Sequence, residues 1–108
     1  VDGGLRYTAL KKDEVQVIDA FATDGLLVEF DLVVLEDDKY FFPPYHAVPI
    51  IRAEVAEEYP EIAELMEKLA GVFNDEVMRD LNYRADGLNQ APEKVARDFL
   101  LETGLIEE

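Results

Sequence analysis

Cysteine, serine and tryptophan are absent from this sequence of 108 residues, and histidine occurs once. The lack of cysteine excludes disulfides, thiolate metal sites and cysteine nucleophiles. The lack of serine removes the nucleophile of a Gly-x-Ser-x-Gly elbow, and threonine is scarce, so nucleophilic catalysis is not expected. No apolar run reaches the length that crosses a bilayer. We therefore predict that the chain is not an enzyme and that it needs no cofactor.

The single histidine, His46, is the first residue to test as a metal ligand. It would need carboxylate partners, and Asp37 and Asp38 are close to it in sequence. The other carboxylates show no spacing that identifies paired acid–base work. Those between Glu54 and Glu64 instead follow the pattern of a solvated helix face. We expect His46 to be an ordinary loop residue, and we predict neither a catalytic nor a metal site.

Acidic side chains outnumber basic ones by 25 to 10, which gives a net charge of −15. Such a field repels phosphate groups, so nucleic acids and anionic membrane surfaces are not expected as partners. It attracts a cationic ligand, although physiological salt screens the attraction over about 8 Å. A strongly charged surface also keeps a protein soluble, and this alone explains part of the excess charge.

The pattern of apolar residues predicts an α/β fold. Residues 15–20 are apolar and β-branched, and residues 32–35 lack polar alternation, as strands buried on both faces do. The second half has amphipathic helical spacing, with starts at Pro60, Asn74 and Pro92. We expect a small, mostly parallel sheet flanked by helices. The expected helices are residues 5–12, 53–59, 61–70, one after 74 and one from 92. The buried stripe of helix 61–70 is expected to be Ile62, Leu65, Met66 and Leu69.

A turn is expected where the first strand ends, at Phe21-Ala22-Thr23-Asp24-Gly25. Gly25 permits a positive φ, and either Thr23 or Asp24 can cap a following turn. Asp24 has two interpretations at this position: a structural turn residue, or a hinge or ligand contact.

Aromatic residues gather in segments that are not expected to be regular. Phe21 follows the first strand, and four more rings lie in or beside the segment that holds Pro43 and Pro44. These rings either pack into a core or interface, or form an aromatic cage. The faces of aromatic rings are electron-rich, so several rings can hold a quaternary ammonium group by cation–π attraction. The four rings of the proline-containing segment are Tyr40, Phe41, Phe42 and Tyr45.

In this order and spacing, the segments resemble the glycine betaine/carnitine/choline-binding proteins of ABC-type osmoprotectant importers. The resemblance covers nearly the whole chain, which matches the C-terminal portion of such a protein and amounts to well under half of it. The segments that carry it are Phe21-Ala22-Thr23-Asp24-Gly25, Leu32 to Lys39, Phe42-Pro43-Pro44-Tyr45 to Pro49, Arg52, Tyr59-Pro60, Leu69-Ala70-Gly71, Leu81-Asn82-Tyr83, Val95-Ala96 and Leu105.

The resemblance implies part of a two-lobed fold of the periplasmic-binding-protein type II kind. Residues 1–31 would be an inter-lobe segment, and residues 32–108 would form a lobe with C-terminal helices. The ligand would lie in the cleft between the lobes, with Phe21 and Tyr45 as two rings of an aromatic cage. The family often has tyrosine at the position of Phe21, so the cage keeps its ring face and loses one hydroxyl. Thr23 and Asp24 complete the set of ligand-binding candidates.

The implied function is capture of a quaternary-ammonium osmolyte, such as glycine betaine, carnitine or choline, for an ABC importer. The implied partners are the permease subunits. The implied location is the periplasm, or the extracellular face of the bacterial membrane with a lipid anchor or a fusion to the permease. We take Val1 as a boundary set either by processing or by the choice of the expressed segment, so that export signals could have been lost upstream. Homodimer formation or domain swapping would cover apolar surface of a partial lobe. The alternative function is an acidic protein–protein adaptor that presents its helical second half.

Overall fold

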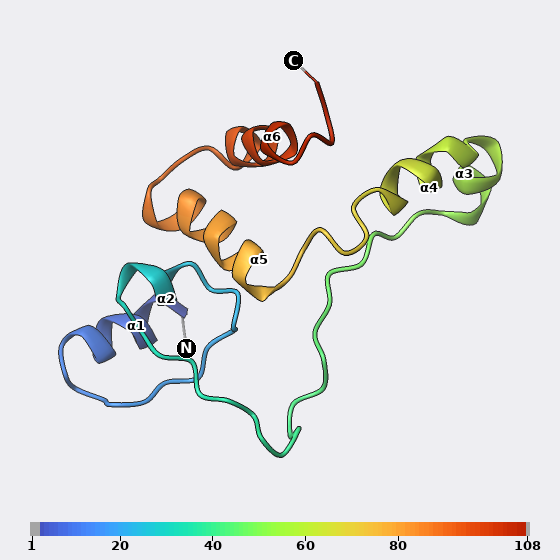
Figure 1. Cartoon of the computed structure of the whole chain (residues 1–108). Coiled ribbons are helices and arrows are strands. Elements are labelled where there is room, and N and C mark those ends of the chain that lie inside the picture. The colour runs from blue at the N-terminus through green and yellow to red at the C-terminus, as the bar shows by residue number, and fades with distance from the viewer. Residues whose placement is uncertain (1–2, 108) are drawn as a thin grey trace. The chain divides into compact units, whose positions relative to one another are not determined.

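The computed structural model describes residues 3–107, and its regular elements are all helical (Figure 1). The chain divides into two units, one drawn from residues 1–34 and 74–108 and the other from residues 35–73. The helices of the first unit are α1 (Gly3–Lys11), α2 (Leu26–Glu29), α5 (Asp75–Asn82), the π-helix η1 (Tyr83–Gly87) and α6 (Pro92–Glu102). The second unit contains α3 (Ala53–Glu58) and α4 (Pro60–Glu67).

The predicted parallel sheet is wrong for this chain, because residues 3–107 contain no strand. The α/β expectation, and with it a sheet-containing part of a two-lobed periplasmic-binding-protein fold, is therefore not what the structure shows. A strand is stable only when a neighbour pairs with its backbone. Within the described residues, the backbone groups of residues 15–20 make no hydrogen bond to other backbone groups. In residues 32–35 the one such bond runs from the Leu32 amide to the carbonyl of Leu27 in α2.

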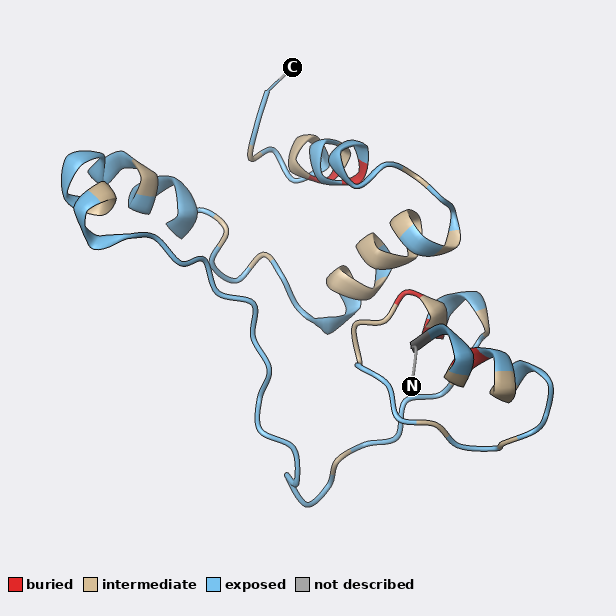
Figure 2. Cartoon of the chain, turned by 180° about the vertical axis from the view of Figure 1, so that it is seen from behind, coloured by how far each residue is buried: buried red, intermediate tan, exposed pale blue. Residues whose placement is uncertain are grey.

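The small core of the first unit brings its N-terminal and C-terminal parts together. Tyr7 of α1, Leu27 of α2, and Val95 and Phe99 of α6 are the buried apolar residues (Figure 2). The ring of Tyr7 lies 6.0 Å from the ring of Phe30, measured between centroids. Helices α5 and η1 contact each other and α2, and α6 contacts η1. This core supports the segment between α1 and α2, which carries most of the candidate site.

The second unit has almost no core. Helices α3 and α4 contact each other, yet neither buries a residue. The stripe expected to be buried on helix 61–70 is wrong, because Leu65 and Met66 are 52% and 40% exposed and Ile62 and Leu69 are only partly buried. Residues 41–54 are all exposed as well. The second unit is therefore stabilised mainly by local turns rather than by packing.

Local signals predicted helix starts better than they predicted tertiary contacts. The Asn74 side chain accepts a hydrogen bond from the amide of Val77 at 2.8 Å and caps α5, as expected. Pro60 and Pro92 occupy the first turns of α4 and α6. Gly25 differs from expectation, since its φ is −64° and it precedes α2 in a right-handed conformation. Its small size matters instead, because a Cβ there would lie 2.5 Å from the backbone nitrogen of Tyr83.

We predict that Gly25→Ala lowers the stability of the first unit by about 1–3 kcal/mol, the usual cost of overpacking. The added methyl group would force the segment before α2 away from the backbone of Asn82 and Tyr83. Urea unfolding followed by circular dichroism measures the change. Gly104→Asn is the control, because nothing lies within 4 Å of its Cβ position and asparagine tolerates its φ of +70°. Equal unfolding midpoints for Gly25→Ala and the parent chain would contradict the close approach.

Candidate ligand-binding site

The segment Phe21–Gly25, called the binding loop below, is organised around the carboxylate of Asp24. The Tyr7 hydroxyl donates a hydrogen bond to Asp24 Oδ2 at 2.6 Å. The Phe21 amide donates to the same oxygen at 3.3 Å, and the Asp24 amide donates to the Phe21 carbonyl at 3.0 Å. The loop thus closes on itself as a turn and is tied to α1. Asp24 therefore has the structural role in the turn that was one of its two expected interpretations, and a ligand contact by Asp24 stays a prediction.

Helix α5 holds the other side of the binding loop. Arg79 Nε donates to the carbonyl of Ala22 at 2.7 Å, and Asn82 Nδ2 donates to the carbonyl of Thr23 at 2.7 Å. Both donors are nearly sixty residues away in sequence, so the C-terminal helices determine where the loop lies. Gly25 allows the loop to approach the end of α5 closely. Side chains from α1 and α5 therefore donate hydrogen bonds to three consecutive loop residues, Ala22, Thr23 and Asp24. These bonds restrict the motion of the loop.

Tyr7 acts as a permanent hydrogen-bond donor. Its side chain is buried, and burial raises the pKa of its hydroxyl far above the usual range. The hydrogen bond to the Asp24 carboxylate raises this pKa further, because the bond requires the protonated phenol. A hydrogen bond to a carboxylate is among the stronger neutral-to-charged contacts in proteins. The tie between α1 and the binding loop therefore persists across the physiological pH range.

A pocket of about 330 Å³ lies beside the binding loop and combines aromatic with acidic groups. The Phe21 side chain lines it and is 57% exposed. Asp24 lines it from the loop, and Asp86 lines it from η1. Ring surface together with carboxylates is the chemistry that attracts an organic cation. The remaining lining residues are Gly4, Arg6, Tyr7, Gly25 and Leu26.

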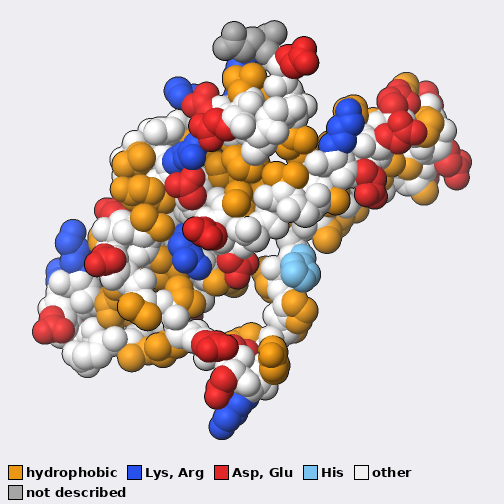
Figure 3. All heavy atoms as spheres, viewed as in Figure 1, with side chains coloured by type: hydrophobic (Ala, Val, Ile, Leu, Met, Phe, Trp, Pro, Cys, Tyr) orange, Lys and Arg blue, Asp and Glu red, His pale blue; other side chains and the backbone are white. Residues whose placement is uncertain are grey.

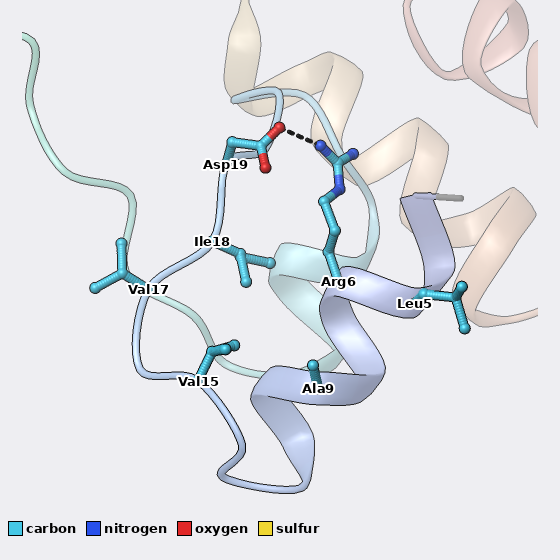
Figure 4. Close-up of a pocket in the computed structure, with 7 residues that line it drawn as sticks. All are labelled: Leu5, Arg6, Ala9, Val15, Val17, Ile18 and Asp19. Carbon is cyan, nitrogen blue, oxygen red and sulfur yellow. Dashed lines mark hydrogen bonds and ion pairs between the residues drawn. The ribbon is translucent and has the colours of Figure 1, made fainter. Parts of the chain in front are cut away.

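A larger pocket of about 580 Å³, between α1 and residues 15–19, has a different character (Figure 4). Its lining is mainly aliphatic and includes no aromatic ring. The one acidic group in the lining, Asp19, is engaged in an ion pair with Arg6. This pocket therefore lacks the groups that hold a quaternary ammonium, and the smaller pocket is the better candidate.

The four predicted ligand-binding residues fall in different units. Phe21, Thr23 and Asp24 share the binding loop of the first unit, whereas Tyr45 belongs to the second. Tyr45 is 86% exposed, so in this chain it is not a core tyrosine. The prediction that Phe21 and Tyr45 share a cavity stays a prediction.

Other functional classes gain no support from the described residues. The side chain of His46 is at the surface (Figure 3), and no group of three or more potential metal ligands occurs within residues 3–107. None of the helices in this range has the length and hydropathy needed to cross a membrane. Acidic side chains are spread over the visible face of the molecule rather than gathered at one place (Figure 3). The net charge is therefore not by itself a binding site.

Sequence reasoning missed Tyr7, Arg79, Asn82 and Asp86. The spacing of Arg79 and Asn82 carries a weak signal, because residues three apart share one helix face. A polar pair on one face of an amphipathic helix predicts that its side chains have hydrogen-bond partners. It does not predict that these partners are backbone carbonyls of a distant loop. Tyr7 gives no comparable signal, since an aromatic residue in a short helix is expected to pack without a specific acceptor. Asp86 lies in a π-helix, which periodicity does not predict.

Comparison with known proteins identifies the class. Residues 1–102 match the family described as the substrate binding domain of ABC-type glycine betaine transport system. This chain belongs to that family of solute-binding domains, which is not a class of enzymes. The resemblance inferred from segments between Phe21 and Leu105 is thereby confirmed.

Individual relatives cover nearly all of the chain. The ergothioneine transport permease/ergothioneine binding protein EgtU of Helicobacter pylori is 45% identical over 105 residues, which are 97% of this chain and 19% of that protein. The glycine-betaine-binding protein of Pseudomonas aeruginosa is 44% identical over 108 residues, 100% of this chain and 35% of that protein. The carnitine transport binding protein OpuCC of Listeria monocytogenes is 40% identical over 104 residues, 96% of this chain and 34% of that protein. The chain thus spans between a fifth and about a third of their lengths.

We predict that Tyr7→Phe destabilises the first unit by about 1.5–3 kcal/mol, the usual cost of losing a hydrogen bond to a charged group. The phenyl ring keeps its packing against Phe30, so the loss isolates the hydroxyl. Urea unfolding measures it. The matched control is Tyr83→Phe, because the Tyr83 hydroxyl makes no hydrogen bond within residues 3–107. A Tyr7→Phe variant as stable as its parent would show that the tie to Asp24 contributes nothing.

Proposed function

We propose that this chain forms part of the ligand cleft of a solute-binding protein that captures a quaternary-ammonium compound for an ABC importer. One observation carries the proposal: the exposed ring of Phe21 shares a pocket with the carboxylates of Asp24 and Asp86. The loop that bears Phe21 is held from two sides, by Tyr7 and by α5. A ring on a restrained loop binds at a lower entropy cost than a ring on a mobile one.

The chemistry of the ligand head group supports an aromatic cage. A trimethylammonium group has no N–H donor, so carbonyls and carboxylates cannot hold it by ordinary hydrogen bonds. Ring faces attract it through the quadrupole, with about 0.5–2 kcal/mol for each contact that is desolvated. Phe21 and Tyr45 supply two such rings. Phenylalanine at position 21 offers the same face as tyrosine but leaves the ligand one hydrogen bond fewer.

The names of the relatives favour the same head group. Glycine betaine, carnitine and ergothioneine appear in those names. All three molecules carry a trimethylammonium group, and they differ in what is attached to it. The shared group is what the rings and carboxylates of this chain can recognise. Discrimination between the three would come from residues that contact the rest of the ligand.

The family match supports the partners and location in this proposal. A solute-binding domain of an ABC importer delivers its ligand to permease subunits, and it works in the periplasm or at the extracellular face of the bacterial membrane. The Helicobacter relative carries both permease and binding protein in its name, which favours fusion as one means of tethering. For this chain alone we include dimer formation or domain swapping in the proposal, because neither helix of its second unit contains a buried residue. Nothing in the family match favours an acidic adaptor.

We predict that Tyr45→Ala and Phe21→Ala each weaken glycine betaine binding by about 1–2 kcal/mol, or roughly five- to thirtyfold. The test protein is the Pseudomonas relative in which the matching 108 residues are replaced by this chain. Calorimetry measures the dissociation constant, and a thermal melt measures stability. The melting temperature of Tyr45→Ala should change little, because the side chain is exposed.

The control for these two variants is Tyr59→Ala, an exposed ring of the second unit that lies outside the proline-containing segment. It should leave glycine betaine affinity unchanged. If Tyr45→Ala lowers the melting temperature and leaves affinity intact, Tyr45 is a packing residue and the cage assignment fails.

We also predict that this chain alone binds glycine betaine, carnitine and choline weakly or undetectably. Loss of even two ring contacts removes about 1–4 kcal/mol, up to roughly a thousandfold in dissociation constant. Calorimetry on the isolated 108-residue chain tests this. Micromolar affinity for a chain that sedimentation shows to be monomeric would contradict the prediction.

A further inference from the structure

A second aspartate, Asp37, organises the start of the aromatic segment in the second unit. Its Oδ1 accepts a hydrogen bond from the Phe41 amide at 3.0 Å, and its Oδ2 accepts one from the Phe42 amide at 2.8 Å. The Tyr40 amide donates to the Asp37 carbonyl at 3.2 Å. Asp37–Phe42, called the aspartate clamp below, is therefore closed by three hydrogen bonds. In Figure 1 it lies on the teal-green stretch between α2 and α3.

The clamp holds the backbone in a conformation that it would not adopt unaided. Tyr40 has a φ of +51°, in the left-handed region that a residue with a side chain enters only at an energetic cost. The rings of Phe41 and Phe42, which follow Tyr40, are 5.0 Å apart in an edge-to-face arrangement. The amides of Phe42 and then Phe41 lower the pKa of the Asp37 carboxyl, so it stays ionised and accepts both bonds at neutral pH.

The clamp is linked to Tyr45 by two consecutive prolines, which restrict the backbone between them. Phe42 is clamped at its amide and precedes a proline, which restricts it to extended conformations. Pro43 has a fixed φ and also precedes a proline, and Pro44 has a fixed φ. Few free dihedral angles therefore remain between the Phe42 amide and Tyr45. The direction of the backbone at Phe42, where the clamp ends, therefore determines the position of the Tyr45 ring.

We propose that Asp37 is a positioning residue for ligand binding: its carboxylate clamps the Phe41 and Phe42 amides and, through Pro43-Pro44, holds the Tyr45 ring in its binding position. This rests on the proposed function, because it assumes that Tyr45 contacts the ammonium group. Asp37 itself touches no ligand in this proposal. It lowers the dissociation constant by reducing the conformational freedom that Tyr45 loses when the ligand binds.

The first test examines the clamp without any ligand. Amide hydrogen exchange is measured by NMR on this chain and on its Asp37→Ala, Asp37→Asn and Asp38→Ala variants. Asp37→Ala should accelerate exchange at both Phe41 and Phe42. Asp37→Asn keeps one acceptor oxygen and should protect only one of these amides. Asp38→Ala removes the same charge from the next, exposed residue and should leave both amides as in the parent.

The second test measures glycine betaine affinity in the Pseudomonas protein that carries this chain. Asp37→Ala should raise the dissociation constant, but by no more than Tyr45→Ala does, which is up to about thirtyfold. Asp37→Asn should restore part of the loss, and Asp38→Ala should cause none. In the Tyr45→Ala background, Asp37→Ala should have no further effect, because the ring that it positions is gone.

The two tests separate the failure of this inference from the failure of the proposed function. Equal exchange of the Phe41 and Phe42 amides in the parent and in Asp37→Ala would overturn the clamp, whatever the affinities are. An equal loss of affinity from Asp37→Ala with and without the Tyr45 ring would overturn its action through Tyr45. If Tyr45→Ala binds glycine betaine as the parent does, the proposed role of Tyr45 fails, and with it the role of Asp37 in binding, although the exchange result stands.

Discussion

The hydrogen bond between the Tyr7 hydroxyl and the Asp24 carboxylate is the contact on which the first unit depends. It joins α1 to the binding loop across 17 residues of sequence. The same carboxylate oxygen receives the Phe21 amide, so one acidic group fixes both the position of the loop and its shape. A partly buried carboxylate without hydrogen-bond donors would destabilise the fold by more than an ordinary hydrogen bond stabilises it. The loop is therefore most stable where Tyr7 can reach it, and α5 then satisfies the carbonyls that remain.

Local chemistry was predictable from the sequence, and long-range pairing was not. Asn74 as a cap and Pro60 as a helix start need only their neighbours, so the structure agrees with expectation there. The turn at Asp24 was also foreseen, but its donor Tyr7 was not, because no pattern connects them. Residues 15–20 have strong β propensity, yet a strand requires a hydrogen-bonded neighbour, and residues 3–107 supply none. β propensity shows that residues 15–20 could form a strand, but the strand forms only if another strand pairs with their backbone.

The two candidate ring residues are presented by different physical means. Phe21 stands on a loop that is tied to two helices by side-chain hydrogen bonds. Tyr45 stands in a segment whose residues are exposed, where proline geometry and the clamp of Asp37 take the place of a core. Both arrangements reduce the conformational entropy that binding would otherwise remove. An aspartate accepting backbone amides is common to both, which explains why acidic residues near the rings need not contact a ligand.

The large negative charge therefore contributes less to recognition than it first suggests. Charges spread over a surface act over about 8 Å in physiological salt, so most of the acidic residues lie too far away to hold a ligand. Asp24 and Asp37 have already committed oxygens to a phenol and to backbone amides. A trimethylammonium group cannot donate a hydrogen bond to the oxygens that remain. In the proposed function, selection of this group over smaller cations would come from the apolar faces of the rings. Ring faces lose little when they are dehydrated, whereas a metal ion or ammonium would lose a tightly held water shell that the rings do not replace.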